Sequence, residues 1–206
     1  MRKEEKTKLT YERIMSAAIA EFGKKTFNDA SLTTLCNENG ISKGLIYHNF
    51  KNKDELYLKC VEKCFETMTT YFKSKEYEGN SVKESIYNLF QMRQQFFQEN
   101  PYYCNIFFHT VLQPPEHLRK EIRALRKQYD DFYANCFKDL LQHIQIRDEI
   151  PIEAAVEYFM VFLEMYNGYF QSKSSENEDI HALIEDHEVN LSKLLDIMLF
   201  GVAKEG

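Results

Sequence analysis

The feature that most constrains the fold is the recurrence of apolar residues at intervals of three and four along nearly the whole chain. This spacing places apolar side chains on one face of an α-helix. Only 7 Gly and 4 Pro occur in 206 residues, and many of them lie between the periodic segments, where they end helices or form turns. The sequence therefore predicts an all-α protein of about nine helices, with no strand, internal repeat or low-complexity tract.

Capping residues mark where several of these helices begin. Asn52 with Glu55, and Ser81 with Glu84, have the spacing of a capping box, in which each side chain binds a free amide at the start of the helix. Asn100 can cap the helix that Pro101 opens, because a proline suits the first helical position. The predicted helices cover residues 10–25, 31–37, 42–49, 52–75, two segments that start at 81 and 100, and residues 116–145, 151–173 and 180–203.

Composition predicts a soluble globular protein, since 44% of the residues are hydrophobic and 28% are charged. No segment approaches the ~18 uncharged apolar residues that a membrane span needs. The amino terminus mixes both charge signs and lacks the apolar core of a secretory signal. Five cysteines, an odd number in apolar surroundings, indicate reduced thiols. We therefore expect a cytoplasmic protein.

The charge is distributed unevenly. The net charge is −6, but residues 1–60 hold 11 Lys and Arg against 8 Asp and Glu, whereas the remainder holds 15 against 24. A positively charged first quarter permits contact with DNA, whose phosphates attract Lys and Arg. Charge clusters are equally often no more than solvated faces, so this asymmetry alone does not decide the function.

Residues 31–50 contain two short predicted helices separated by a turn at Gly40. Leu32, Leu35 and Cys36 supply the apolar face of the first helix, and Ile46 and Phe50 that of the second. This arrangement is typical of a helix-turn-helix, whose second helix enters the DNA major groove. The outward surface of the second helix carries a cation, polar groups, a ring and a glycine that allows close approach: Lys43, Gly44, Leu45, Tyr47, His48 and Asn49.

Phosphate contacts are expected at the amino ends of these two helices, where free amides attract anions. The hydroxyls of Ser31, Thr33, Thr34 and Ser42 lie there, with Lys53 just downstream. Residue spacing alone is equally compatible with two ordinary short helices in a helical bundle.

Residues 10–58 resemble the tetracycline-repressor (TetR) family of bacterial regulators. The resemblance rests on the segments RIMSAAIAEFGKKTF, SLTTL and above all ISKGLIYHNFKNKDELY. It implies that residues 42–45 and 47–49 face DNA, with Thr33 and Lys53 on its backbone. Two positions depart from the family pattern: Thr26 stands where glycine is common, and Asn49 where a ring is more frequent. The departure at Thr26 affects the geometry of the turn after the first helix. The departure at Asn49 suggests a different preference for bases or phosphates.

The resemblance further implies an N-terminal DNA-binding domain, residues 1–51, and a C-terminal ligand-binding and dimerisation domain, residues 52–206. Family members pair through their last two helices, and a homodimer of this kind binds a palindromic double-stranded operator with reading helices roughly 34–36 Å apart. The apolar stripes expected at this interface are Val156, Phe159, Leu163, Tyr166, Tyr169 and Phe170, and Leu191, Leu194, Leu195, Met198 and Leu199. The expected function is transcriptional repression that an unidentified small molecule relieves.

The C-terminal region is rich in rings, with most of the 13 Tyr and 16 Phe after residue 57 and no Trp. Rings at helical spacing most often pack in a core, but they can also form the walls of an effector pocket. The predicted lining comprises Phe65, Met68, Phe90, Phe97, Tyr103, Phe107, Tyr129, Phe132, Tyr133 and Tyr166.

Three alternatives receive less support. An enzyme is disfavoured, because no phosphate-binding glycine loop, nucleophile elbow or metalloprotease helix motif is present. An all-helical interaction module that no longer reads DNA stays open. Cys60 and Cys64 share one helix face and suggest a redox switch or metal site, but buried packing thiols are more common. We expect no cofactor and no metal, and we expect the polar residues near the start of the last helix to be exposed: His181, Glu185 and His187.

Overall fold

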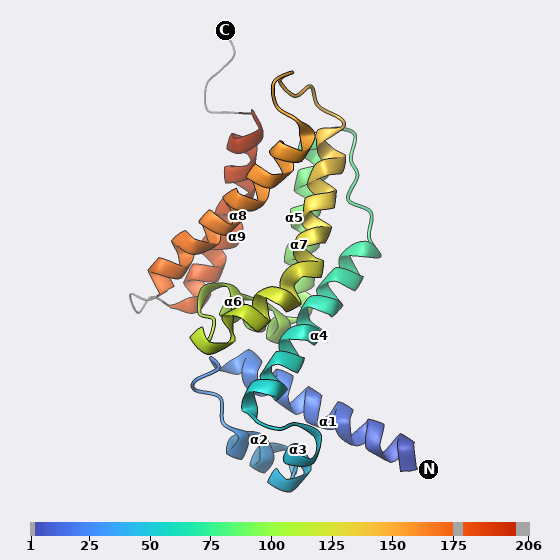
Figure 1. Cartoon of the computed structure of the whole chain (residues 1–206), viewed down its shortest axis with the longest axis vertical. Coiled ribbons are helices and arrows are strands. Elements are labelled where there is room, and N and C mark those ends of the chain that lie inside the picture. Colours follow the sequence, from blue (N-terminus) through green and yellow to red (C-terminus); the bar gives the residue numbers. More distant parts are fainter. Residues whose placement is uncertain (1–2, 175–178, 201–206) are drawn as a thin grey trace. The chain divides into compact units, whose positions relative to one another are not determined.

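A computed structural model describes residues 3–174 and 179–200 (Figure 1). Over these residues the chain forms nine α-helices, one short 3-10 helix and no strand, so the predicted all-α class is confirmed. The helices are α1 (Lys3–Lys24), α2 (Leu32–Asn39), α3 (Lys43–Asn49), α4 (Lys53–Lys73), α5 (Val82–Glu99), α6 (Pro101–Leu112), η1 (Glu116–Leu118), α7 (Arg119–Leu141), α8 (Ile152–Ser174) and α9 (Ile180–Phe200). None of the described helices combines the length and apolar character needed to cross a bilayer.

The chain forms two compact units. The first comprises Met1–Met68 and Glu99–Gln128, and the second comprises Thr69–Gln98 and Tyr129–Gly206. Both α4 and α7 therefore begin in the first unit and end in the second. This division by contacts differs from the predicted boundary after residue 51, which concerns function and stays a prediction.

The first unit is built around the packing of α1 on α6. Gly23, in the last turn of α1, lies so close to α6 that a Cβ atom there would be 2.8 Å from the Cα of Tyr102. The Asn105 side-chain amide donates a hydrogen bond of 2.7 Å to the Gly23 carbonyl. A residue without a side chain thus allows the two backbones to approach, and α6 holds the end of α1 in place.

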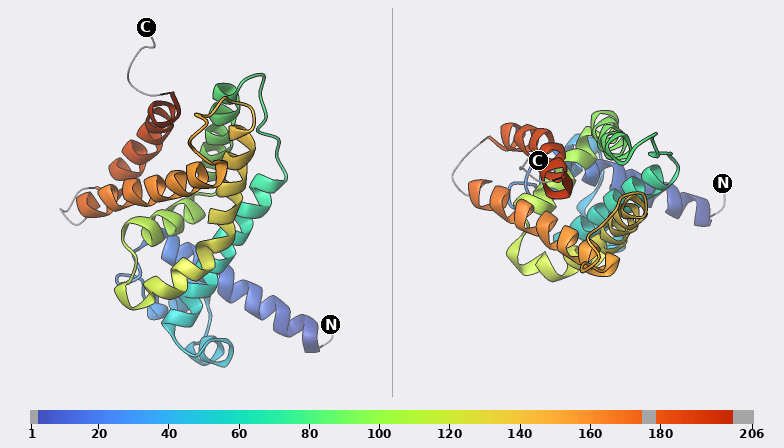
Figure 2. Two further views of the ribbon diagram at one scale, coloured as in Figure 1. Left: turned by 45° about the horizontal axis from the view of Figure 1, so that its top comes forward. Right: turned by 90° about the horizontal axis from the view of Figure 1, so that it is seen from above.

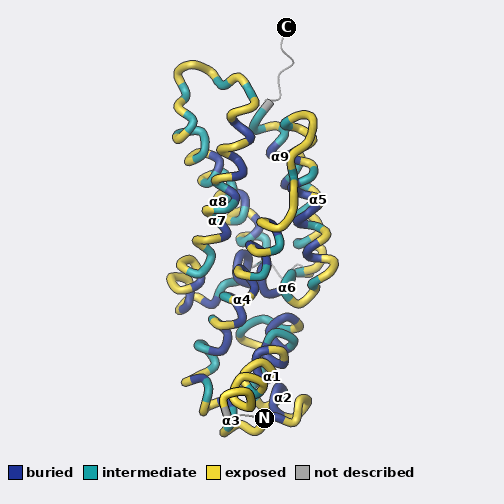
Figure 3. Tube along the Cα trace, turned by 90° about the vertical axis from the view of Figure 1, so that its right-hand side faces the viewer, coloured by how far each residue is buried: buried dark blue, intermediate teal, exposed yellow. Residues whose placement is uncertain are grey.

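The second unit has an aromatic interior. The Phe72 ring lies 5.8 Å from the rings of both Phe96 and Phe132, and Phe137 stacks on Phe159 at 3.9 Å. The two last helices, α8 and α9, also pack against each other here (Figure 2). Dark-blue bands along the helices in Figure 3 mark these buried faces, which recur at the spacing that the apolar residues predict.

All three of the helices with a predicted cap begin where predicted, and two of the three predicted caps are confirmed. Asn52 accepts a hydrogen bond from the Glu55 amide (2.9 Å), and Ser81 accepts one from the Glu84 amide (3.2 Å). The prediction that Asn100 caps α6 is wrong, because its side chain makes no cap hydrogen bond. Three boundaries also differ: α1 begins at Lys3 rather than residue 10, the helix expected at 116 opens as the 3-10 turn η1, and α7 ends at Leu141 rather than residue 145. The predicted end of the last helix at residue 203 lies outside the described residues.

Candidate DNA-binding and effector sites

The turn between α2 and α3 is fixed by Gly40 and Arg13. Gly40 adopts the left-handed conformation (φ 58°), which favours glycine, and its amide bonds to the Cys36 carbonyl. The Arg13 guanidinium, on α1, donates to the carbonyls of Asn39 (2.5 Å) and Gly40 (3.2 Å). The angle between the two short helices is therefore held from both sides. Sequence reasoning did not single out Arg13, whose place in a polar stretch of α1 gives no signal of this contact.

Serine residues cap both short helices. The Ser31 hydroxyl accepts from the Thr34 amide (3.3 Å), and the Ser42 hydroxyl accepts from the Leu45 amide (3.2 Å). Each hydroxyl keeps its own proton, so it can cap the helix and donate to a phosphate oxygen at the same time. The Glu21 carboxylate anchors this region by accepting from the Ser31 amide (2.8 Å). Burial raises the pKa of Glu21, but the Ser31 and Lys25 hydrogen bonds hold it below its ordinary value.

The outer face of α3 is open. Ile46 and Phe50 are buried, whereas Tyr47 is 54% exposed and its neighbours Lys43, Gly44 and His48 are also exposed. We call these four residues the α3 face. No atom lies within 4 Å of the Cβ position at Gly44. These exposed side chains do not contribute to the core, while the helix that carries them is held in place by its buried residues. They are therefore available to bind a partner.

Five predicted DNA contacts are less open, and Ser31 is one of them, being half-buried. Leu45 and Asn49 are half-buried, and the Asn49 amide donates to the Leu45 carbonyl (2.8 Å). The Lys53 ammonium lies 4.5 Å from the Phe27 ring centre, and its partial burial lowers its pKa. Thr33 is exposed, whereas Thr34 is half-buried.

The predicted effector residues fall into two groups, one in each unit. In the first unit, the rings of Phe65 and Phe107 lie 6.0 Å apart, and both residues are buried. In the second unit, the rings of Tyr129 and Tyr133 lie 4.8 Å apart. Nearly all ten residues are buried; only Tyr103 and Phe132 are half-buried. The first group is Phe65, Met68, Tyr103 and Phe107, and the second is Phe90, Phe97, Tyr129, Phe132, Tyr133 and Tyr166.

A polar cluster in the interior of the second unit was not predicted. The Arg93 guanidinium, on α5, binds the Glu188 carboxylate, on α9, through two hydrogen bonds of 2.9 Å each. His187, expected to be exposed, is only 1% exposed; that expectation is wrong because the ring packs between Tyr166 and Phe170 of α8. Isolated charged residues on an amphipathic helix give no sequence signal that they are buried.

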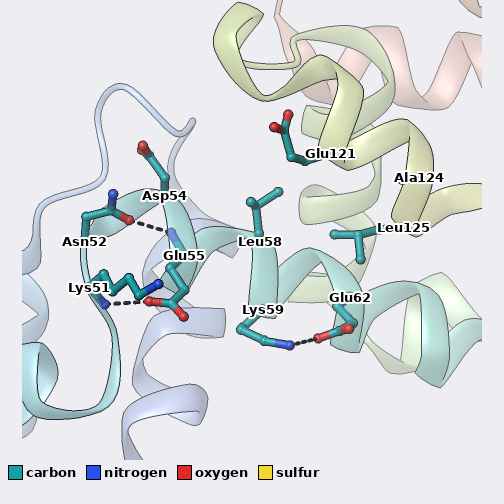
Figure 4. A pocket seen from close by; sticks show the side chains of 10 residues that line it. All are labelled: Lys51, Asn52, Asp54, Glu55, Leu58, Lys59, Glu62, Glu121, Ala124 and Leu125. Carbon is teal, nitrogen blue, oxygen red and sulfur yellow. Dashed lines mark hydrogen bonds and ion pairs between the residues drawn. The ribbon is translucent and has the colours of Figure 1, made fainter.

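A surface cavity of about 560 Å³ lies in the first unit, between the start of α4 and the start of α7 (Figure 4). Leu58 and Leu125 face each other across it, and its rim is mostly charged. None of the predicted effector residues contributes to it. The lining is Lys51, Asn52, Asp54, Glu55, Leu58, Lys59, Glu62, Glu121, Ala124 and Leu125.

The thiols do not form a reactive site. Cys60 and Cys64 are both buried, and burial raises the pKa of each thiol above its ordinary value. A raised thiol pKa disfavours the thiolate that redox chemistry and metal binding require. Over the part of the chain that the structure describes, no three His, Cys, Asp or Glu side chains gather in a way that could hold a metal.

The last two helices expose an apolar face. Met165 is 70% exposed and Tyr158 is 69% exposed; both lie on α8 with exposed Val161 and Tyr169. Their spacing of three and four places them on one side of the helix. Several residues expected at the dimer interface instead point into the protomer, where they are buried: Phe159, Tyr166, Phe170, Leu191 and Leu195. The exposed apolar face of α8 therefore shares Tyr169 with the predicted stripe but otherwise consists of Tyr158, Val161 and Met165, which the sequence did not suggest.

A capped helix pair with one open polar face, in a chain that is all-helical over its described residues, has the form of a helix-turn-helix DNA-binding module. Residues 14–60 match the model of the tetR family of bacterial regulatory proteins, and residues 81–202 match that of the tetracyclin repressor-like C-terminal domain. The chain belongs to the tetR family. The prediction of a transcriptional regulator rather than an enzyme is therefore confirmed.

Individual relatives agree with this assignment. The chain is 24% identical over 177 residues to IcaR of Staphylococcus epidermidis, a negative transcriptional regulator of a biofilm operon, with 85% of this chain and 89% of IcaR covered. The fold is similar to Bacillus subtilis FadR in complex with stearoyl-CoA (TM-score 0.64, 14% identity, 94% and 100% covered). It is also similar to a TetR-family regulator from Agrobacterium tumefaciens (TM-score 0.61, 15% identity, 91% and 97% covered).

Proposed function

We propose that the chain is a homodimeric repressor that binds a palindromic operator through the α3 face and leaves it when a small molecule binds the C-terminal region. The observation that carries this proposal is the α3 face itself, which is exposed while the helix beneath it is fixed by Ser42, Gly40 and Arg13. Lys43, Tyr47 and His48 supply a cation and hydrogen-bonding groups suited to base edges and phosphates.

Residues 1–51 carry DNA binding in this proposal, with phosphate contacts from Ser31, Thr33, Thr34 and Ser42. Ser31 and Ser42 already have the geometry of caps, so their hydroxyls lie beside free helix amides that attract anions. Gly44 lets the α3 face approach DNA closely, Leu45 and Asn49 flank that face, and Lys53 lies beside it against the Phe27 ring. A protein of this activity works where the DNA is, in the cytoplasm.

Residues 52–206 carry effector binding and dimerisation in this proposal. The exposed apolar face of α8 supports pairing, because single-subunit surfaces seldom leave such residues in a row. IcaR, a relative of this chain, is a negative transcriptional regulator, which favours repression as the activity. An effector that prefers the state unable to hold DNA shifts the population toward it. Helix α4, which begins at the DNA-binding region and ends in the second unit, is the segment through which that shift reaches the reading helices.

Selection of duplexes from a random pool tests the proposal without knowledge of the regulated genes. The purified chain should enrich a palindromic sequence, and its affinity for that duplex should fall steeply between low and moderate salt. Tyr47→Ala should lose the preference for the selected duplex over a scrambled one. Equal, weak binding to both duplexes by the unmodified chain would contradict the proposal and favour an interaction module that does not read DNA.

A further inference from the structure

The polar cluster of the second unit is centred on a buried ion pair. Arg93 Nε lies 2.9 Å from Glu188 Oε2, and Arg93 Nη2 lies 2.9 Å from Glu188 Oε1. The side chains are only 6% and 10% exposed. Burying two charges costs more free energy than their attraction returns unless further hydrogen bonds satisfy them, and apolar residues of the same volume often stabilise a core equally well. If the pair only links α5 to α9, the protein spends a large desolvation free energy on a link that apolar side chains could also make.

The surroundings of Arg93 have the composition of a ligand site. The guanidinium lies 5.2 Å from the centre of the Phe97 ring and donates to the Tyr129 hydroxyl. The Tyr133 hydroxyl is buried beside them, where it interacts with the Tyr129 hydroxyl and the Arg93 guanidinium without reaching good hydrogen-bond geometry with either. A hydroxyl of this kind can rotate its proton toward a new polar partner. A planar cation, two hydroxyls and an aromatic wall recognise an acid group joined to an apolar body.

We propose that Arg93 reads the acid group of the effector, and that the Glu188 carboxylate occupies the position that this group takes when the effector binds. The effector is an amphipathic carboxylic acid whose apolar or aromatic body packs among the rings around Phe72 and Tyr133. The carboxylate of the effector displaces Glu188 from the Arg93 guanidinium. It also accepts hydrogen bonds from the hydroxyls of Tyr129 and Tyr133. This inference rests on the proposed function, because it names the chemical class of the effector.

His187 is the new partner of the Glu188 carboxylate once the effector has displaced it from Arg93. Its Nδ1 lies 3.1 Å from Glu188 Oε1, and its Nε2 lies 3.0 Å from Asn167 Oδ1. Both nitrogens thus face oxygen acceptors, an arrangement that a protonated ring satisfies on both sides. Burial holds the pKa of His187 below its ordinary value, with Glu188 opposing this effect and Arg93 adding to it. When the effector neutralises Arg93, His187 takes one proton from solvent and pairs with Glu188.

The other groups around His187 do not replace Glu188 in this role. Tyr166 of α8 donates its hydroxyl proton to the His187 carbonyl (2.7 Å), and the Phe170 ring is apolar. Asp186, the neighbour on α9, is exposed and lies 3.9 Å from the Lys173 ammonium. Glu188 is therefore the one carboxylate among these groups that contacts the His187 ring.

Calorimetry on the full chain without DNA tests the site directly. The probes are octanoate and 3-phenylpropionate, each compared with the alcohol of the same carbon frame. The unmodified chain should bind each acid more tightly than its alcohol, with uptake of about one proton per acid, measured in two buffers of different ionisation enthalpy. His187→Gln should bind the acids without that uptake.

Glu188→Gln removes the competing charge and keeps the side-chain shape. It should lower the melting temperature, bind both acids at least about tenfold more tightly than the unmodified chain does, and regain melting temperature when an acid is added. Glu185→Gln, an exposed position on the same helix, is the matched control and should change neither property. If Glu188→Gln binds neither acid more tightly than its alcohol, the ion pair is only structural and the inference is wrong.

The double variant Arg93→Met with Glu188→Met replaces the pair by apolar side chains of similar volume. It should fold and should bind acid and alcohol equally. Operator binding is measured separately. Acids that bind through Arg93 but do not release DNA would support this site and contradict the proposed release mechanism. If acids release DNA equally well from the double variant, the proposed release mechanism is supported, but Arg93 and Glu188 are not the acid site.

Discussion

Gly44→Ala should separate DNA reading from folding more cleanly than any other change on α3. The added methyl group meets no atom within 4 Å, so it costs no steric energy in the free protein. Alanine also favours a helix over glycine by up to ~1 kcal/mol, which should leave the melting temperature unchanged or raise it by up to about 4 °C for a chain of this length. In the proposed complex with DNA, the same methyl group would lie where the α3 face comes closest to the duplex. Loss of one base or phosphate contact there should weaken operator binding by about 1–3 kcal/mol, or roughly 5- to 150-fold.

Gly23→Ala is the matched control, because it makes the same chemical change at a glycine that is packed. Its Cβ would lie 2.6 Å from the Tyr102 Cβ and 2.8 Å from the Tyr102 Cα, so the backbone of α6 has to shift. Overpacking of this kind costs about 1–3 kcal/mol, which should lower the melting temperature by roughly 2–12 °C. The exposed α3 face is not altered by this change.

Both variants are measured by thermal unfolding, followed by circular dichroism at 222 nm, and by fluorescence anisotropy on the selected duplex. If Gly44→Ala binds that duplex as the unmodified chain does, Gly44 does not approach DNA and the orientation assigned to α3 is wrong. If Gly23→Ala leaves the melting temperature unchanged, the close contact of α1 with α6 does not constrain the first unit.

Three further expectations concern other parts of the chain. Ser42→Ala removes the cap of α3 and should lower the free energy of unfolding by about 1 kcal/mol, measured by urea denaturation; an unchanged value would show that the cap is unimportant. Met165→Glu places a charge on the apolar face of α8 and should raise the dimer dissociation constant in sedimentation experiments, whereas persistence of the dimer would move the interface elsewhere. Because burial lowers the pKa of His187, the free energy of unfolding should be highest above about pH 6.5, the pKa of an unfolded histidine, and should fall as the pH drops below it. His187→Gln should flatten that fall, and an identical pH profile would contradict the assignment.

The helix-turn-helix was predictable because its determinants are local. Ser31, Ser42 and Asn52 each bind an amide within three residues, and Gly40 adopts the left-handed turn. The Arg13 contacts that also hold this turn come from a distant segment, and they were not predicted. A cap or turn of this kind depends on a few neighbouring residues, so their order in the sequence is enough to locate it. Asn100 shows the limit of that reasoning, because a residue suited to capping does not cap when the local backbone directs its side chain elsewhere.

The interior of the second unit was less predictable because it depends on contacts between distant segments. Arg93 and Glu188 are 95 residues apart, and nothing near either residue shows that the two side chains meet. The same limitation applies to His187, whose burial depends on rings from α8. Apart from Tyr169, the stripe of α8 that faces solvent was also missed, because two apolar faces on one helix have the same periodicity and only the tertiary structure separates them.

The buried ion pair also restricts how the protein can diverge. Loss of either Arg93 or Glu188 alone leaves an uncompensated charge in the core, which typically costs 3–5 kcal/mol, or about a third to a half of the stability of a typical domain. Simultaneous replacement of both avoids that penalty. Homologues should therefore vary at these two positions jointly, and a lineage that acquires a new effector has to exchange both residues or retain both.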